Sequence, residues 1–185
     1  MNREEALSLI KEHVKNENSI KHMLATEAIM RSMSKHFNED VEIWSLAGLL
    51  HDLDMEMGDY KEHPEAHGLE TVRILKEKGV SDKILNGILA HNEATGKTRD
   101  TLMEKCIYAV DPLTGFITAI ALVYPSKKLA DVKVKSITKR LKELRFAAGV
   151  NREAMKSIEE VGLEFHQFSE IGLKAMQEIS DDLGL

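Results

Sequence analysis

Six residues of the two types that bind divalent metals recur at the ends or on the apolar faces of predicted helices. They are His22, His51, Asp52, His67, His91 and Asp111. Imidazole nitrogens and carboxylate oxygens are good ligands for hard or borderline divalent cations. Together they would supply two adjacent metal sites that share Asp52 as a bridge. Two metals about 3.5–4 Å apart can hold a phosphoryl group and lower the pKa of a bound water, which can then attack phosphorus at neutral pH.

The His51-Asp52 pair follows an apolar run, Ile43–Leu50, that is typical of a buried helix end. A charge buried without a partner is costly, and a metal ion would remove that cost. An ordinary helix C-terminus would also explain the pair, because a histidine there favours the helix dipole and an aspartate can begin a loop. The pair alone therefore leaves both interpretations open.

The elements that must position these residues are helices. With 5% aromatic residues and only 3 prolines in 185 residues, the composition favours an all-α fold of about eight helices. Apolar spacing predicts helices over 3–14, 19–36, 41–52, 64–79, 81–91, 101–110 and 113–124, with further helices after 151 and over 163–176. We expect His67 to lie one turn inside the helix that Pro64 begins, and Asp111-Pro112 to interrupt an otherwise apolar helix.

Composition also limits the class of protein. A formal net charge of −6 argues against general nucleic-acid binding. A single cysteine, Cys106, excludes an internal disulfide and fits a reducing compartment. No apolar run approaches the length of a membrane span in this interpretation, and the charged N-terminus does not resemble a signal peptide. We therefore expect a cytoplasmic protein without a membrane partner.

The order His, His-Asp and a distant Asp resembles the HD-domain superfamily of metal-dependent phosphohydrolases. His22, His51-Asp52 and Asp111 match its basic pattern, while His67 and His91 match two histidines found in members with a two-metal site. The run Ala47–Leu53 is similar to the HDIG-type subgroup. The sequence around Asp111-Pro112-Leu113-Thr114-Gly115 departs from that of many relatives, which puts the substrate in doubt more than the metals.

The resemblance covers about residues 20–125. It implies one HD-type helical domain over 1–185, with the metal-site core at 20–125 and a basic and C-terminal helical extension at 126–185. The implied cofactors are two divalent ions per chain, from Fe, Mn, Ni, Co, Zn or Mg. The implied reaction is hydrolysis of a phosphomonoester or phosphodiester, especially a nucleotide. A diiron HD-type oxygenase and a non-catalytic nucleotide-binding module remain open, as does a supporting role for His67 and His91 in a one-metal site.

Further residues are candidates for substrate binding and proton transfer. The basic tract 126–145 offers Lys139, Arg140 and Arg145, followed by Arg152, and Lys61 lies near the His-Asp pair; a solvated basic face is the alternative. Asp54 is a candidate general acid or base, or simply a loop residue. His63 competes with His67 as a ligand. We expect Cys106 to be a buried, unreactive thiol. The expected partner is a small phosphate ester, and a homo-oligomer is possible.

Overall fold

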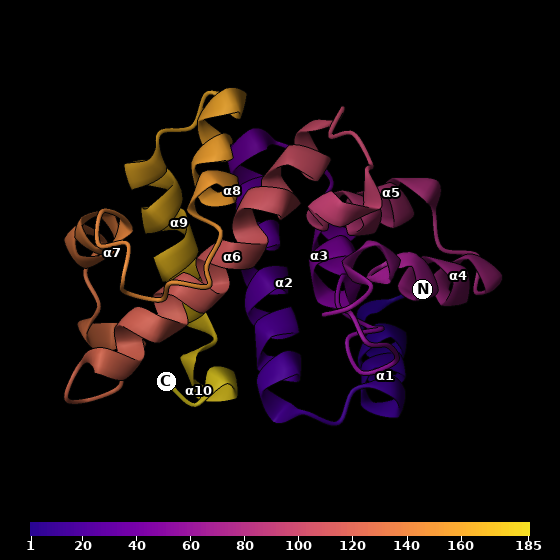
Figure 1. Cartoon of the computed structure of the whole chain (residues 1–185), viewed down its shortest axis with the longest axis horizontal. Coiled ribbons are helices and arrows are strands. Elements are labelled where there is room, and N and C mark those ends of the chain that lie inside the picture. Colours follow the sequence, from indigo (N-terminus) through magenta and orange to yellow (C-terminus); the bar gives the residue numbers. More distant parts are fainter.

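Two long helices, α2 and α6, cross at the centre of the molecule in a computed structural model that describes residues 1–185 (Figure 1). Helices α1, α3, α4 and α5 lie on one side of this crossing and α7, α8 and α9 on the other (Figure 1). The helices are α1 (Arg3–His13), α2 (Glu17–Phe37), α3 (Val41–Leu50), α4 (Leu69–Glu77), α5 (Asp82–His91), α6 (Leu102–Val123), α7 (Val134–Leu141), α8 (Arg152–Lys156), α9 (Phe165–Glu178) and α10 (Ser180–Leu183). The all-α prediction is confirmed, with ten α-helices instead of about eight.

Helices α2 and α3 form the tightest pair in the fold. Asn38 ends α2 in the left-handed conformation with φ 56°, and the Asp40 side chain caps α3, so the two helices turn back on each other. At the crossing, a Cβ added to Gly48 would lie 2.9 Å from the carbonyl oxygen of Thr26. The missing side chain therefore allows the close approach that brings His22 beside the end of α3.

Helix α6 runs without interruption through Pro112, so the predicted break at Asp111-Pro112 is wrong. A proline inside a helix removes one backbone hydrogen bond and costs about 3 kcal/mol. That cost is offset because residues on both sides of the proline, including Val110 and Leu113, are fully buried. Asp111 therefore projects from the middle of a continuous helix rather than capping a new one.

The unbroken α6 also changes the expectation about apolar length. Leu102–Val123 is long and apolar enough to cross a membrane by length and composition, whereas the sequence interpretation found no such run. More than half of its most apolar window, 56%, is buried inside the protein, where it packs against α2, α5, α8 and α9. Its apolar character is that of a central core helix.

The segment before α4 also differs from the prediction. Residues Pro64–Ala66 form only a 3₁₀ turn, and α4 begins at Leu69, so His67 lies between two helical segments and not inside one. The break arises at Gly68, whose φ of 92° is a left-handed conformation that favours glycine. Likewise α3 ends at Leu50, which leaves Asp52 in the following turns.

The close contact at Gly48 predicts a large cost for one added methyl group. Gly48→Ala should lower the free energy of unfolding by about 1–3 kcal/mol, because the rigid Thr26 carbonyl cannot move away. Gly115→Ala in α6 is the matched control, since a Cβ there meets nothing within 4 Å; it should stabilise the protein by up to about 1 kcal/mol. Urea unfolding of both variants measures the difference, and equal stability of the two would contradict the packing argument.

Candidate metal centre

Five segments bring their metal-binding side chains to one place. They are His22 from α2, His51 and Asp52 from the end of α3 and the turn after it, His67 from the segment before α4, His91 from the last residue of α5, and Asp111 from the middle of α6. His51, Asp52 and His91 are all buried, although each carries polar groups. The six candidate ligands of the sequence analysis therefore lie together.

The first group contains His22, His51 and Asp52, with Asp111 beside it. The Nε2 atoms of His22 and His51 are 3.0 Å apart. His22 Nε2 lies 3.4 Å from Asp52 Oδ2 and 3.0 Å from Asp111 Oδ1. The distances and the donor types suit one divalent cation held by two imidazoles and two carboxylates.

The second group contains Asp52, His67 and His91. His67 Nε2 lies 3.0 Å from Asp52 Oδ1 and 3.0 Å from His91 Nε2. His91 Nε2 is 3.6 Å from the same carboxylate oxygen. In each of these two groups of three, the ligand atoms lie within 4.8 Å of one another, and Asp52 belongs to both. Its carboxylate is thus positioned to bridge two adjacent cations.

The second nitrogen of every ring has its own oxygen partner. Nδ1 of His51 lies 2.8 Å from the Gly48 carbonyl, and Nδ1 of His91 contacts the Ile88 carbonyl. Nδ1 of His22 is 2.8 Å from the hydroxyl of Thr114. These contacts favour a proton on Nδ1, as in many metal-binding histidines, and leave Nε2 of each ring facing the centre.

Converging Nε2 atoms are unfavourable unless something positive lies between them. Two neutral imidazoles that each carry the proton on Nδ1 would direct lone pairs at each other across 3.0 Å, as at His22 and His51. A divalent cation removes this conflict, and extra protons do so in its absence. The donor set therefore fits a metal centre.

The pKa values of the metal-free protein follow from the same crowding. Burial opposes charge on His22, but its hydrogen bond to Asp111 and the nearby carboxylates raise its pKa to about 9. Burial likewise opposes charge on His67, yet bonds to Asp52 and Asp54 raise its pKa to about 10. Burial lowers the pKa of His51 to about 4, so this ring stays neutral. The surrounding imidazoles hold the pKa of Asp52 well below its usual value against the effect of burial.

Asp54, expected as a general acid or base, lies behind the ligands. It is fully buried, and Oδ1 accepts a hydrogen bond of 2.9 Å from Nδ1 of His67. Oδ2 accepts from the backbone N–H groups of Gly68 at 2.8 Å and Thr71 at 3.2 Å. Burial would raise the pKa of Asp54, but these bonds lower it. The carboxylate orients His67 and has no access to a substrate, so the geometry supports a positioning role.

The predicted cationic substrate contacts are not in the wall of the hollow that opens onto the metal ligands. Lys61, Lys139 and Arg145 are exposed elsewhere, and Arg140 pairs with Glu143 at 2.6 Å. Their role in substrate binding remains a prediction that this arrangement does not support.

Arg152, the other cation named from the sequence, serves the fold. It is buried, and its guanidinium donates to backbone carbonyls between Leu141 and Val150, including that of Glu143 at 3.1 Å. It therefore satisfies carbonyls of the turns after α7 and has no donors to spare for a phosphate.

The positions of His63 and Cys106 decide two questions that the sequence raised: which histidine joins the cluster, and whether the thiol is reactive. The side chain of His63 is 71% exposed and contacts Glu65, whereas that of His67 is 14% exposed and lies in the ligand cluster. Cys106 is fully buried, and burial raises the pKa of its thiol to about 12, which makes it unreactive.

A hollow of about 410 Å³ opens onto the cluster. Besides ligands, its wall contains Met55, Asn92, Glu93, Tyr108, Pro112, Asn151 and Ala154. The sequence analysis assigned no role in the site to Asn92, Tyr108 or Asn151, although it did predict the helix that Asn151 caps. Asn92 directly follows a ligand histidine, and its amide donates to the carbonyl of His67 at 3.0 Å. That adjacency was a usable signal, whereas nothing in the sequence placed Tyr108 or Asn151 beside the ligands.

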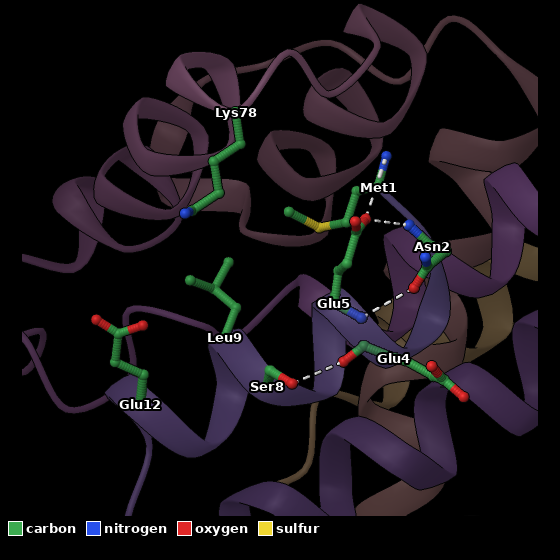
Figure 2. Close-up of a pocket in the computed structure, with 8 residues that line it drawn as sticks. All are labelled: Met1, Asn2, Glu4, Glu5, Ser8, Leu9, Glu12 and Lys78. Carbon is green, nitrogen blue, oxygen red and sulfur yellow. Dashed lines mark hydrogen bonds and ion pairs between the residues drawn. The ribbon is translucent and has the colours of Figure 1, made fainter.

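Another hollow, of about 780 Å³, is a different feature beside α1 (Figure 2). Its wall holds Glu4, Glu5 and Glu12 with Lys78, and no histidine. Figure 2 shows that Glu5 and Asn2 bond each other in a capping box and that Ser8 bonds the Glu4 carbonyl. These groups stabilise the start of the helix and do not converge on a ligand.

Comparison with known proteins agrees with this geometry. The sequence profile of the HD domain matches residues 19–115, which contain all six candidate ligands. An uncharacterized protein of Methanocaldococcus jannaschii is 27% identical over 160 residues, covering 84% of this chain and 91% of that protein. No solved structure matches the chain.

The raised histidine pKa values predict proton release when metal binds. At pH 7, below the pKa values of about 9 and 10, His22 and His67 each carry an extra proton that a metal must displace. Binding at pH 7 should therefore release about two protons, and affinity should rise as the pH increases towards 9. Calorimetry of Mn²⁺ binding in buffers of different ionisation enthalpy counts the protons, and a count near zero would contradict this assignment.

Asp54→Asn should weaken metal binding without unfolding the protein. The amide preserves the shape of the carboxylate but removes the charge that orients His67. Loss of such a partner typically costs about 10–100-fold in metal affinity. Competition with a metal indicator measures the change, with Asp59→Asn, at an exposed aspartate outside the ligand cluster, as the control. An Asp54→Asn protein with unchanged affinity would overturn the positioning role.

Proposed function

Because the chain belongs to the HD-domain family, a superfamily of metal-dependent phosphohydrolases, we propose that it hydrolyses a phosphomonoester or phosphodiester of nucleotide type. The observation that carries the proposal is the sharing of Asp52 between two groups of ligand atoms. A carboxylate bridge of this kind is typical of centres that hold two metals close enough to act on one phosphoryl group.

The proposal assigns two divalent ions to the six ligands. His22, His51, Asp52 and Asp111 would hold one ion, and Asp52, His67 and His91 the other. Bound metals supply Lewis acidity and a water activated for attack on phosphorus. The ligand types are compatible with several ions. Imidazole and carboxylate suit Fe, Mn, Co, Ni and Zn alike, and Mg accepts the carboxylates.

The protein's own residues hold and protect this centre. Gly48, Thr114, Asp54 and Ile88 each accept a hydrogen bond from a ligand ring, which fixes the direction of every Nε2 atom. Such preorganisation keeps the ligands from reorganising during the reaction. Membership of the HDIG-type subgroup and a location in the cytoplasm complete the proposal; the run Ala47–Leu53 and the lone, unpaired cysteine support them.

The test begins with metal content and an ¹⁸O experiment. Protein purified without chelators should contain about two metal equivalents, and it should hydrolyse members of a phosphoester panel. When the reaction runs in H₂¹⁸O without dioxygen, the label should enter the phosphate released from a monoester, or the phosphomonoester formed from a diester. Asp52→Ala should lose both metal and turnover because it removes the shared ligand.

His63→Ala is the matched control, since this exposed histidine lies outside the cluster and should retain metal and activity. An active, metal-loaded Asp52→Ala protein would refute the proposal. Substrate consumption that requires dioxygen would assign the centre to oxygenase chemistry, and nucleotide binding by fully loaded protein without turnover would assign it to a binding module.

A further inference from the structure

The wall of the hollow above the metal ligands contains no lysine or arginine. Apart from the ligands, its polar residues are Asn92, Glu93, Tyr108 and Asn151. Sites that bind several phosphates in a row normally supply cationic side chains for the charge beyond the metals. We call the part of this hollow formed by Asn92, Glu93, Tyr108 and Asn151 its mouth. The absence of lysine and arginine there is unusual for a site that would bind a polyphosphate.

Glu93 adds a negative charge to the mouth and is held in place. Its Oε2 accepts a hydrogen bond of 3.1 Å from the hydroxyl of Tyr108. The guanidinium carbon of Arg99 lies 3.7 Å from the centre of the Tyr108 ring, which fixes the ring from another side. Arg99 contacts the Tyr108 ring, but it is not among the residues that line the hollow.

The two amide side chains of the mouth, Asn92 and Asn151, differ in how many hydrogen-bond donors remain free. The NH₂ group of Asn92 donates to the carbonyls of Pro64 at 2.7 Å and His67 at 3.0 Å, so it is occupied. The oxygen of Asn151 accepts from the N–H of Ala154 at 3.0 Å. Its NH₂ group donates toward the hydroxyl of Tyr108, which leaves one neutral N–H donor. A neutral donor and an aromatic ring suit an uncharged polar group.

We propose that this site takes a substrate with one phosphoryl group on an uncharged, polar organic part, such as a nucleoside monophosphate, and rejects di- and triphosphates. Glu93 is the specificity-determining residue. This inference rests on the proposed function. Bound metals would neutralise the single phosphoryl group, whereas each further phosphate would face Glu93 without a cation in the wall. The volume of about 410 Å³ lies within the range of small-ligand sites.

Binding and hydrolysis should be measured with adenosine monophosphate and adenosine triphosphate on metal-loaded protein. Calorimetry gives both Kd values, with metal content determined before and after each titration so that chelation is detected. The variants are Glu93→Gln, Arg99→Gln and, as the matched control, Glu170→Gln, an exposed carboxylate on α9 outside the hollow.

The native protein should bind the monophosphate at least about tenfold more tightly than the triphosphate. Glu93→Gln should narrow that ratio by roughly fivefold, as expected for removal of one partly screened like charge. Glu170→Gln should leave the ratio unchanged. Equal binding of the two nucleotides by the native protein, or a ratio unaffected by Glu93→Gln, would overturn the inference. Loss of triphosphate binding in Arg99→Gln would also overturn it, because Arg99 would then be a phosphate ligand.

The hydrolysis assay separates this inference from the function on which it rests. Turnover of the triphosphate in preference to the monophosphate would overturn the inference and leave the phosphohydrolase proposal intact. No turnover of any phosphoester, combined with the expected Kd ratio, would refute the hydrolase and support the selectivity of the mouth.

Discussion

The structure depends on one arrangement of charge: a buried carboxylate, Asp52, surrounded by four imidazole rings. A carboxylate in such a place is tolerated only with positive charge beside it. In the metal-free protein, protons on His22 and His67 provide that charge, whereas bound cations would do so in the loaded protein. Protons and metals therefore compete for the same positions, and the centre has a compensating charge in both states.

The surrounding fold is arranged to hold the rings in their orientations. Gly48 contributes twice, since its lack of a side chain lets α2 approach α3 and its carbonyl accepts from His51. Gly68 also contributes twice, because its left-handed backbone separates His67 from α4 and its N–H bonds Asp54. Gly48 lies three residues before His51, and Gly68 directly follows His67, so local backbone geometry and ligand orientation are determined together.

Much of the fold and the candidate cluster could be predicted from sequence. Apolar periodicity located the helices that carry His22 and His91, and residue type and order identified all six candidate ligands. The break at Pro112 was mispredicted because local proline preference does not register the burial of both halves of α6. The roles of Asp54 and Arg152 were missed because the partners of a buried polar group depend on contacts distant in sequence, here with His67 and with the turns after α7.

The candidate ligands are distributed from α2 to α6, so the site exists only when these helices have assembled. A cation that binds the assembled chain and not the unfolded one stabilises the native state in proportion to the logarithm of its free concentration. The abundance of the folded protein in a cell would thus follow the supply of the metal as well as the protein's own packing. Metal scarcity would then reduce the amount of this protein, not only the activity of each molecule.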